Sequence, residues 1–136
     1  MKILVIDGQG GRLGKSLVEE VRASFPQAEL VAVGTNTTAT EAMHKAGAAR
    51  CATGENAVRV ACRTADIIMG PLGIAVADSL MGEISPAMAN AVASAKGYRV
   101  LIPMNLCDTY VAGVLGPASG IVADAIEHVR RLLQEA

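Results

Sequence analysis

The first sixteen residues constrain the fold more than any other part of the chain. Residues 3–6 are consecutive aliphatic residues, residues 8–14 are rich in glycine, and Leu13, Leu17 and Val18 then follow a helical period. The apolar run predicts a strand buried on both faces, and the period predicts a helix directly after the glycines. A strand that turns this abruptly into a helix aims free backbone N–H groups and the positive end of the helix dipole at one place. An anion binds well there.

The spacing of the glycines distinguishes three interpretations of this turn. The dinucleotide fingerprint G-x-G-x-x-G fails because Leu13 stands at its third glycine. The variant G-x-x-G-x-x-G is met by Gly8, Gly11 and Gly14, and it predicts a pyrophosphate approaching the backbone at Gly11. A phosphate loop, G-x-x-x-x-G-K-[ST], misses by one residue because Gln9 occupies its first glycine. We expect nucleotide or phosphate binding, with glycines that merely permit a tight turn as the alternative.

The cofactor expected at this turn is a nicotinamide dinucleotide. The stretch GQGGRLGK, residues 8–15, resembles the cofactor loop of dihydrodipicolinate reductases, which bind NADH or NADPH on a Rossmann-like domain. In dinucleotide folds an acidic residue at the tip of the second strand favours NAD. Here the tip is Thr35 and Asn36, and Arg12 is placed to meet a 2′-phosphate. These residues favour NADP, with NAD as the alternative.

Composition excludes several classes of partner. The 12 basic residues nearly balance the 13 acidic ones, so no field attracts nucleic acid or an anionic membrane. No apolar run approaches the roughly 20 residues that span a bilayer, and the apolar start lacks the features of a signal peptide. Cys51, Cys62 and Cys107 form no C-x-x-C pair, which is typical of reduced thiols and predicts no metal site. We expect one cytoplasmic domain over residues 1–136.

Strand and helix patterns alternate along the chain. Further strands are expected at residues 30–33, 48–54, 67–69 and 100–102. Residues 55–63 fit either a helix or a strand, and we favour the helix. The alternation predicts an α/β protein, with a Rossmann-like three-layer fold and a mainly parallel central sheet of about five strands. With strand order 3-2-1-4-5, the order reverses between the first and fourth strands, and ligands bind at such a point.

Local signals predict where two of the helices begin. Thr38 and Glu41 have the spacing of a capping box. Ser85 and Pro86 have the residue types preferred at the cap and at the first helical position. We therefore expect helices after Thr38 and after Ser85.

Several short motifs, spread over residues 1–114, resemble a family of short bacterial proteins known only as a domain of unknown function. They are IDGQGG followed by Gly14-Lys15, GTN at 34–36, TGEN at 53–56, GP at 70–71, ADS and GEISPAM within 77–88, and IPMNLC at 102–107. The resemblance implies a Rossmann-like fold, and it implies no activity because the family has none assigned. Members often have a third consecutive glycine where Arg12 stands, so the turn is less free in this chain.

Topology predicts which loops form the ligand site. Residues 8–15 and 70–83 follow the first and fourth strands, so we expect these two loops to face each other, with Asn105 and Cys107 close by. The phosphates should bind the first loop. The expected ligand-binding residues are Gly8, Gln9, Gly10, Gly11, Arg12, Leu13, Gly14, Lys15, Thr35, Asn36, Gly70, Pro71, Asp78, Ser79 and Asn105.

The segment after the fourth strand carries the candidates for chemistry. Asp78, Glu83 and Cys107 are the candidate catalytic residues, although no pair of them forms a recognisable acid and base. Asp78 and Ser79 either cap a helix or face the crevice. The apolar residues on either side of this pair should be buried against the body or a partner: Ile74, Val76, Leu80 and Met81.

Three classes of function fit these expectations. The first is an NADP- or NAD-binding domain, whose enzymatic form would be a small NAD(P)-dependent reductase. The second is a non-catalytic ligand sensor or assembly subunit. Phosphoryl transfer ranks last, because the strand at 67–69 ends in Gly70 and not in a magnesium-binding Asp. We also expect a homodimer, because a hydrophobic content of 51% is hard to bury in so small a body.

Overall fold

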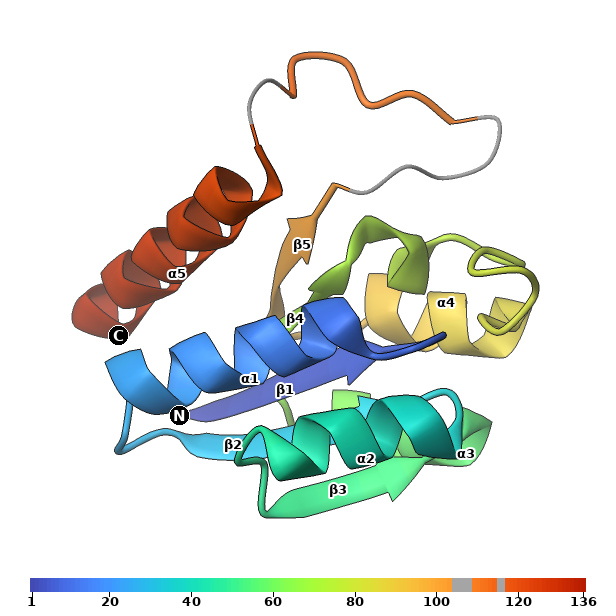
Figure 1. Ribbon diagram of the computed structural model, residues 1–136, viewed down its shortest axis with the longest axis horizontal. Coiled ribbons are helices and arrows are strands. Elements are labelled where there is room, and N and C mark those ends of the chain that lie inside the picture. Colours follow the sequence, from blue (N-terminus) through green and yellow to red (C-terminus); the bar gives the residue numbers. More distant parts are fainter. Residues whose placement is uncertain (104–108, 115–116) are drawn as a thin grey trace.

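The computed structural model describes residues 1–103, 109–114 and 117–136. In this part of the chain, all the strands are parallel and form one sheet in the order β3-β2-β1-β4-β5. Figure 1 shows the sheet between its covering helices. The strands are β1 (Lys2–Asp7), β2 (Glu29–Gly34), β3 (Arg50–Thr53), β4 (Ile67–Pro71) and β5 (Tyr98–Ile102). The α/β class and the parallel sheet predicted from the sequence are confirmed, and the strand order is the one assumed for the expected site.

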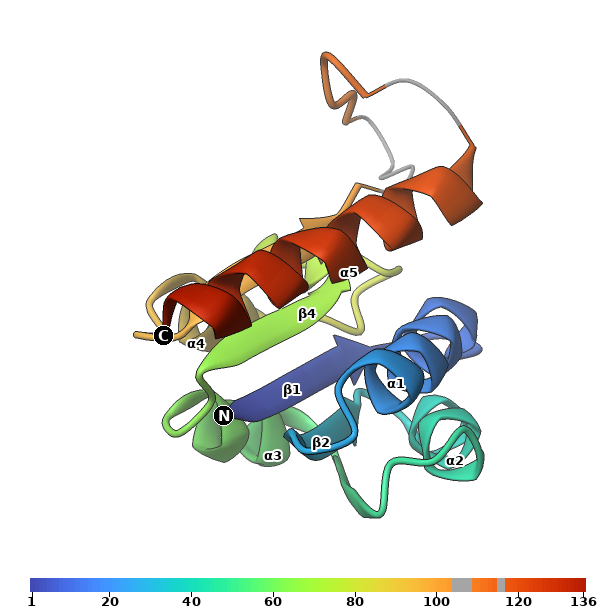
Figure 2. The ribbon, with the colours of Figure 1, turned by 90° about the vertical axis from the view of Figure 1, so that its left-hand side faces the viewer.

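Helices cover both faces of the sheet. Figures 1 and 2 show α1, α2 and α5 on one face and α3 and α4 on the other. The helices are α1 (Arg12–Ser24), α2 (Thr37–Lys45), α3 (Glu55–Cys62), α4 (Pro86–Ala93) and α5 (Ala118–Glu135), with a short 3₁₀ helix η1 (Leu72–Ala75) after β4. The helix preferred at residues 55–63 is confirmed. The result is the three-layer Rossmann-like arrangement.

The central strand β1 contributes to both hydrophobic cores. Ile3 and Val5 point toward α1 and α5, and Leu4 and Ile6 point toward α3 and α4, and all four are fully buried. A strand covered on both faces needs apolar residues at every position, which explains the continuous aliphatic run. The run ends at Asp7, so a carboxylate lies at the carboxyl edge of the sheet.

This carboxyl edge is where strand order reverses. Strand β1 pairs with β2 on one side and with β4 on the other, with Val5 opposite Ala32 and Met69. The connections after β1 and β2 run to one side of the sheet, and those after β3 and β4 run to the other. The loops that follow β1 and β4 therefore meet above one point, as expected from the sequence.

Helix caps agree with the sequence in one case and differ in the other. Ser85 caps α4, and its hydroxyl accepts a hydrogen bond from the Met88 N–H at 3.2 Å, as predicted. The predicted capping box of Thr38 and Glu41 is wrong, because Asn36 caps α2 and accepts from the Ala39 N–H at 2.8 Å. Asn36 comes directly after β2, so the strand tip and the helix cap are one structure.

Candidate functional site

A buried carboxylate lies beneath the glycine turn. Asp7 is 5% exposed, and its two oxygens accept hydrogen bonds from the N–H groups of Gly8 at 2.8 Å and Gly14 at 2.7 Å. Burial raises the pKa of Asp7, the donors on Gly14 and Gly8 oppose this, and the charge of Glu83 raises the pKa further. Asp7 therefore stabilises the glycine turn. It accepts hydrogen bonds from the N–H groups of Gly8 and Gly14, two residues that were expected to bind a ligand.

Other N–H groups of the turn are open. Within the described residues, the backbone N–H groups of Gly10, Arg12 and Leu13 donate to no protein atom. Arg12 and Leu13 begin α1, so the positive end of the helix dipole reinforces these donors. Free donors at such a position favour phosphates and other anions.

A second carboxylate lies above the same turn. One oxygen of Glu83, Oε1, accepts hydrogen bonds from the Gln9 N–H at 2.9 Å, the Thr35 hydroxyl at 2.6 Å and the Asn36 side-chain amide at 2.7 Å. Burial disfavours the charged form of Glu83, but the three hydrogen bonds outweigh burial and lower its pKa. These donors come from the tips of β1 and β2. Together they form a cradle for an anion, and a protein carboxylate occupies it.

The turn at residues 76–85 places Glu83 in this cradle. The two ends of this turn are joined by a hydrogen bond from the Asp78 N–H to the Ile84 carbonyl at 2.7 Å. The Ile84 side chain is fully buried and anchors the turn to the body of the protein. The Ser79 hydroxyl donates to the Gly73 carbonyl and so ties the turn to η1. Ser79 therefore holds its own segment together, and the Asp78 side chain lies exposed at the surface.

The upper part of this turn has an uncommon backbone. Asp78, Leu80 and Met81 have φ angles of 65°, 54° and 55°, and Gln9 across the cradle has a φ of 48°. This left-handed region is costly for residues with a side chain, and such residues cluster at functional sites. Met81 is 90% exposed, so it does not pack against the body of the single chain, and its burial against a partner stays a prediction. The turn is strained where it reaches over the site.

The glycines of the first turn serve different purposes. A Cβ on Gly10 would meet no atom within 4 Å, so Gly10 borders open space. A Cβ on Gly11 would lie 2.8 Å from the Cα of Ala39, and the φ of Gly11 is 73°. Gly11 thus lets α1 approach α2 in a left-handed conformation. The approach of a ligand to the backbone at Gly11 stays a prediction, and Gly10 is the glycine that borders open space.

Four other predicted site residues lie at the same edge of the sheet, and they differ in burial. Lys15 and Arg12 are exposed on the first turn of α1. Gly70 and Pro71 are buried at the end of β4, and a Cβ on Gly70 would lie 2.3 Å from the Ile6 carbonyl oxygen. Gly70 thus allows β4 to pack closely on β1. The predicted residues Asn105 and Cys107 lie outside the described part of the chain.

Sequence reasoning missed Asp7 and assigned Glu83 a different role. Asp7 stands directly between an aliphatic strand and a glycine turn, where a buried acidic residue needs N–H donors, so a signal was present. Glu83 was predicted as a catalytic candidate. It is instead bonded to three donors, on Gln9, Thr35 and Asn36, and all three residues were expected to bind a ligand.

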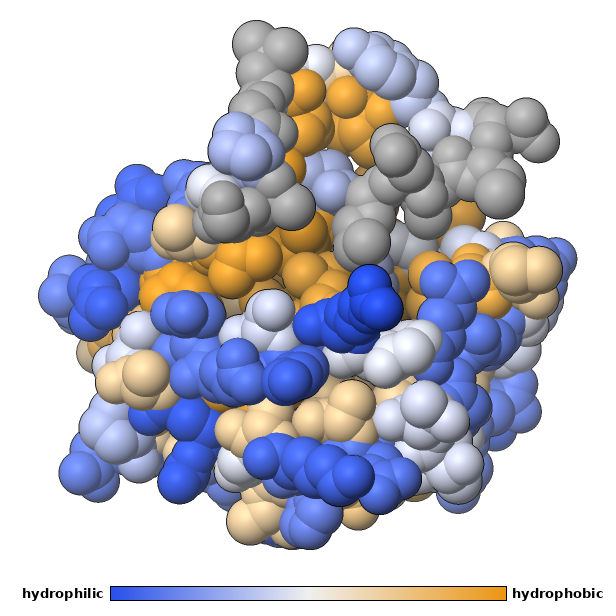
Figure 3. All heavy atoms as spheres, in the orientation of Figure 1, coloured by the Kyte–Doolittle hydropathy of each residue, from blue (hydrophilic) through white to orange (hydrophobic). Residues whose placement is uncertain are grey.

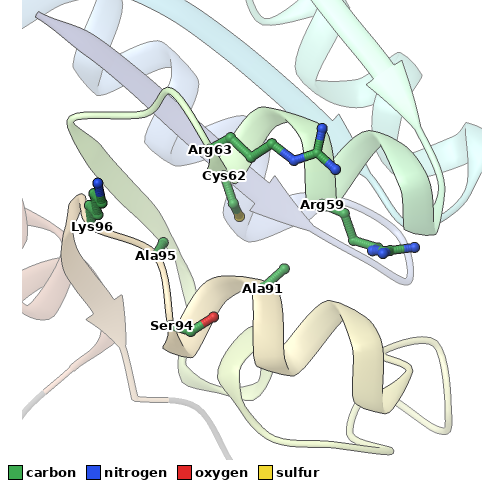
Figure 4. A pocket seen from close by; sticks show the side chains of 7 residues that line it. All are labelled: Arg59, Cys62, Arg63, Ala91, Ser94, Ala95 and Lys96. Atoms are coloured by element: carbon green, nitrogen blue, oxygen red, sulfur yellow. The ribbon is translucent and has the colours of Figure 1, made fainter.

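A separate cavity of about 380 Å³ lies between α3 and α4. Its lining residues are Arg59, Cys62, Arg63, Ala91, Ser94, Ala95 and Lys96. Figure 4 shows the side chains of Arg59, Arg63 and Lys96 pointing in different directions. Burial raises the pKa of the Cys62 thiol to about 11, so this thiol stays protonated at neutral pH. The cations lie near the C-terminal ends of two helices, where the dipoles favour them. The cavity is at the amino edge, away from the candidate site.

Fold and site together define a Rossmann-like α/β protein with hydrogen-bond donors gathered where strand order reverses. The chain belongs to the family described as Domain of unknown function (DUF3842), which matches residues 2–134. No curated protein shows significant sequence similarity to the chain. Among solved structures, the chain is similar to a dodecameric FMN-dependent UbiX-like decarboxylase from Escherichia coli O157:H7. The two share 18% identity at a TM-score of 0.54, over 98% of this chain and 95% of that chain.

These comparisons correct the predicted cofactor. NADP or NAD was expected, and the similar solved structure is that of an FMN-dependent enzyme. The geometry gives a physical reason, because Gly8 and Gly14, two of the three fingerprint glycines, donate their N–H groups to Asp7. A pyrophosphate would have to compete with that buried carboxylate.

Among the described residues, no helix is long and apolar enough to cross a membrane. The same residues contain no group of three or more His, Cys, Asp or Glu side chains that could hold a metal ion.

Proposed function

We propose that this protein binds FMN, or a closely related flavin mononucleotide, at the carboxyl edge between β1 and β4. The observation that carries the proposal is the open N–H groups of Gly10, Arg12 and Leu13 at the point where strand order reverses. A terminal phosphate would accept hydrogen bonds from these groups and be favoured by the dipole of α1. The fold likeness to an FMN-dependent enzyme supports a flavin as the remainder of the ligand.

A mononucleotide suits this site better than a longer ligand. A single phosphate needs one set of donors, and the open donors lie within four residues, between Gly10 and Leu13. The exposed cations Arg12 and Lys15 on the first turn of α1 add positive charge beside them. The uncharged part of the ligand would extend from Gly10, where no atom blocks the space, toward the loop after β4.

The proposal is limited to binding. Asp7 and Glu83, the carboxylates bonded at this edge, each accept hydrogen bonds from more than one donor. Neither is therefore free to act as a general acid or base while these bonds persist. The second candidate function is a ligand sensor or assembly subunit. It is favoured by the strained, exposed turn at residues 76–85, which contacts the site directly.

We also propose that the protein forms a homo-oligomer. A groove of about 500 Å³ runs between β5 and α5, and its walls include Val100, Ile102, Val114 and Ile121. Figure 3 shows apolar side chains gathered on the face that carries α5 and β5. Strand β5 is also an edge strand. An apolar groove beside an edge strand favours contact with a second copy, and the similar decarboxylase is a dodecamer.

Flavin fluorescence tests the proposed ligand. We expect the protein to change the fluorescence of FMN in a saturable way and to bind riboflavin, which lacks the phosphate, at least about tenfold more weakly. NADH and NADPH serve as controls and should not compete. Equal affinity for FMN and riboflavin would contradict the proposed phosphate contact. The absence of a saturable change with either compound would contradict flavin binding.

A further inference from the structure

We infer that the Glu83 carboxylate is an internal anion that holds the candidate site closed, and that it leaves its cradle when an anionic ligand binds. The inference rests on the proposed function in one respect, because it takes the carboxyl edge between β1 and β4 as the ligand site. It adds a regulated movement of the turn at residues 76–85, which no comparison assigns.

The hydrogen bonds of Glu83 are those expected for a bound anion. A backbone N–H, a hydroxyl and an amide converge on one oxygen, at distances of 2.6–2.9 Å. The donors belong to Gln9, Thr35 and Asn36, which lie far from Glu83 in sequence but next to each other at the strand tips. A phosphate oxygen accepts the same donors with the same geometry. The cradle therefore suits a ligand anion as well as it suits Glu83.

Charge prevents both anions from occupying the site together. Asp7 lies under the turn and already feels the charge of Glu83, which contributes to its raised pKa. A phosphate on the neighbouring N–H groups of Gly10 and Arg12 would add up to two further negative charges in the same small region. Like charges at such distances repel strongly outside bulk water. The carboxylate that can move is Glu83, because Asp7 is buried in the body of the protein.

The turn that carries Glu83 is built to move. Three of its non-glycine residues, Asp78, Leu80 and Met81, hold left-handed φ angles that are relieved if the turn opens. Its outer part is exposed, with Met81 at the tip, while Ile84 stays buried at the base. Segments with few buried contacts open at low free energy. Opening can thus expose the cradle and leave the core intact.

Three variants test the inference. Glu83→Gln keeps an acceptor oxygen in the cradle but removes the charge. Ser79→Ala removes the hydroxyl that ties the turn to Gly73 and changes no charge. Glu20→Gln, on the exposed face of α1, is the matched control for loss of one negative charge. Circular dichroism melting verifies that all three variants fold.

Inorganic phosphate, FMN and riboflavin are the probes. We expect Glu83→Gln to bind phosphate and FMN at least about fivefold more tightly than the parent protein, with riboflavin changed less than about twofold. Ser79→Ala should also tighten the binding of phosphate and of FMN, but by a smaller factor. Glu20→Gln should leave both affinities unchanged. Equal or weaker binding of FMN by Glu83→Gln overturns the inference and leaves the proposed function standing. Tighter phosphate with no flavin binding supports the inference and overturns the flavin. No binding of any probe by any variant overturns both.

Hydrogen exchange separates a moving turn from a purely electrostatic effect. If Glu83 leaves the cradle, the amides of residues 78–84 in the parent protein should exchange faster when FMN or phosphate is bound. Protection of these amides by the ligand would show that the turn stays closed, and it would overturn the inference even if Glu83→Gln tightened binding.

Discussion

The Glu83 carboxylate lies 2.9 Å from the backbone nitrogen of Gln9, a residue 74 positions earlier in the chain. This hydrogen bond joins the turn after β4 to the loop after β1, across the point where strand order reverses. The bond is accepted by a charged group, so it is stronger than one between neutral groups. The candidate site is therefore formed by two loops that are distant in sequence. The loop after β1 supplies hydrogen-bond donors, and the turn after β4 supplies the Glu83 carboxylate.

Gly10 should control ligand binding and Gly11 should control stability. A side chain on Gly10 projects into open space, so Gly10→Val should weaken FMN binding at least about tenfold and leave the melting temperature nearly unchanged. Calorimetry with FMN and thermal melting measure both quantities. Gly120→Ala is the control, because it lies in α5 away from the site and should raise stability by about 0.5–1 kcal/mol without affecting binding. Normal FMN affinity in Gly10→Val would contradict the site.

Gly11→Ala should destabilise the protein. Its φ of 73° is unfavourable for alanine, and the new Cβ would lie 2.8 Å from the Cα of Ala39 in α2. We expect a loss of at least about 1–2 kcal/mol in the free energy of unfolding. Urea denaturation compared with Gly10→Ala isolates the effect, since that variant adds the same methyl group one residue away. Equal stability of the two variants would mean that neither the left-handed φ nor the close approach to Ala39 restricts position 11.

Asp7 should be required by the turn, even though burial opposes its charge. Asp7→Ala leaves the N–H groups of Gly8 and Gly14 without acceptors, which should cost about 1–3 kcal/mol of unfolding free energy. Asp7→Asn retains one acceptor oxygen, so its loss should be smaller. Denaturation at neutral pH ranks the two variants. A more stable Asp7→Ala protein would mean that relief of the buried charge outweighs both hydrogen bonds.

The contribution of Glu83 to stability should depend on pH in a defined direction. Its folded pKa lies below the ordinary value of 4.5, so the charged form stabilises the folded state above that value. The contribution is lost as the pH falls through the lowered folded pKa. The stability difference between the parent protein and Glu83→Gln should therefore shrink below pH 4.5. Asp7 is near Glu83 and its pKa is raised, so its effect on the free energy of unfolding changes with pH in the opposite direction. The comparison is therefore repeated with Asp7→Asn in both proteins. A difference that is constant with pH would mean that the charge of Glu83 does not stabilise the turn.

Self-association should be detectable in solution. The apolar groove between β5 and α5 is open in the single chain, and we expect assembly to cover it. Light scattering should give a mass that is a multiple of the monomer mass of 13.9 kDa. A charged substitution in the groove wall, such as Val114→Glu, should lower that mass. The monomer mass at micromolar concentrations would contradict the proposed oligomer.

Much of the fold followed from local sequence patterns. Residues 3–6 could be assigned to a central strand because their unbroken apolar character is needed only where helices cover both faces. The parallel pairing of the first two strands then followed from the short strand-helix-strand connection and its fixed handedness. Ser85 with Pro86 marked the start of α4 through side-chain and backbone preferences that act within a few residues.

The site was less predictable because it depends on contacts between distant residues. Thr38 and Glu41 have the spacing of a cap, but Asn36 caps α2 because its amide also reaches Glu83. Topology predicted that the loops at 8–15 and 70–83 face each other, but Glu83 stands in a turn with no helical or strand period, so its hydrogen bond to Gln9 was not predicted. The fingerprint spacing favoured Gly11 over Gly10 as the position that a ligand approaches. Only the packing of Ala39 shows which of the two borders open space.

The most direct test of the account is a titration of the isotope-labelled protein with FMN, followed by amide chemical shifts. The largest shifts should occur at the amides of Gly10, Arg12 and Leu13, whose N–H groups donate to no atom of the described residues. Riboflavin at the same concentration should shift these amides much less, because it lacks the phosphate. FMN-induced shifts that leave these three amides unchanged, or that gather at the cavity between α3 and α4, would contradict the central claim.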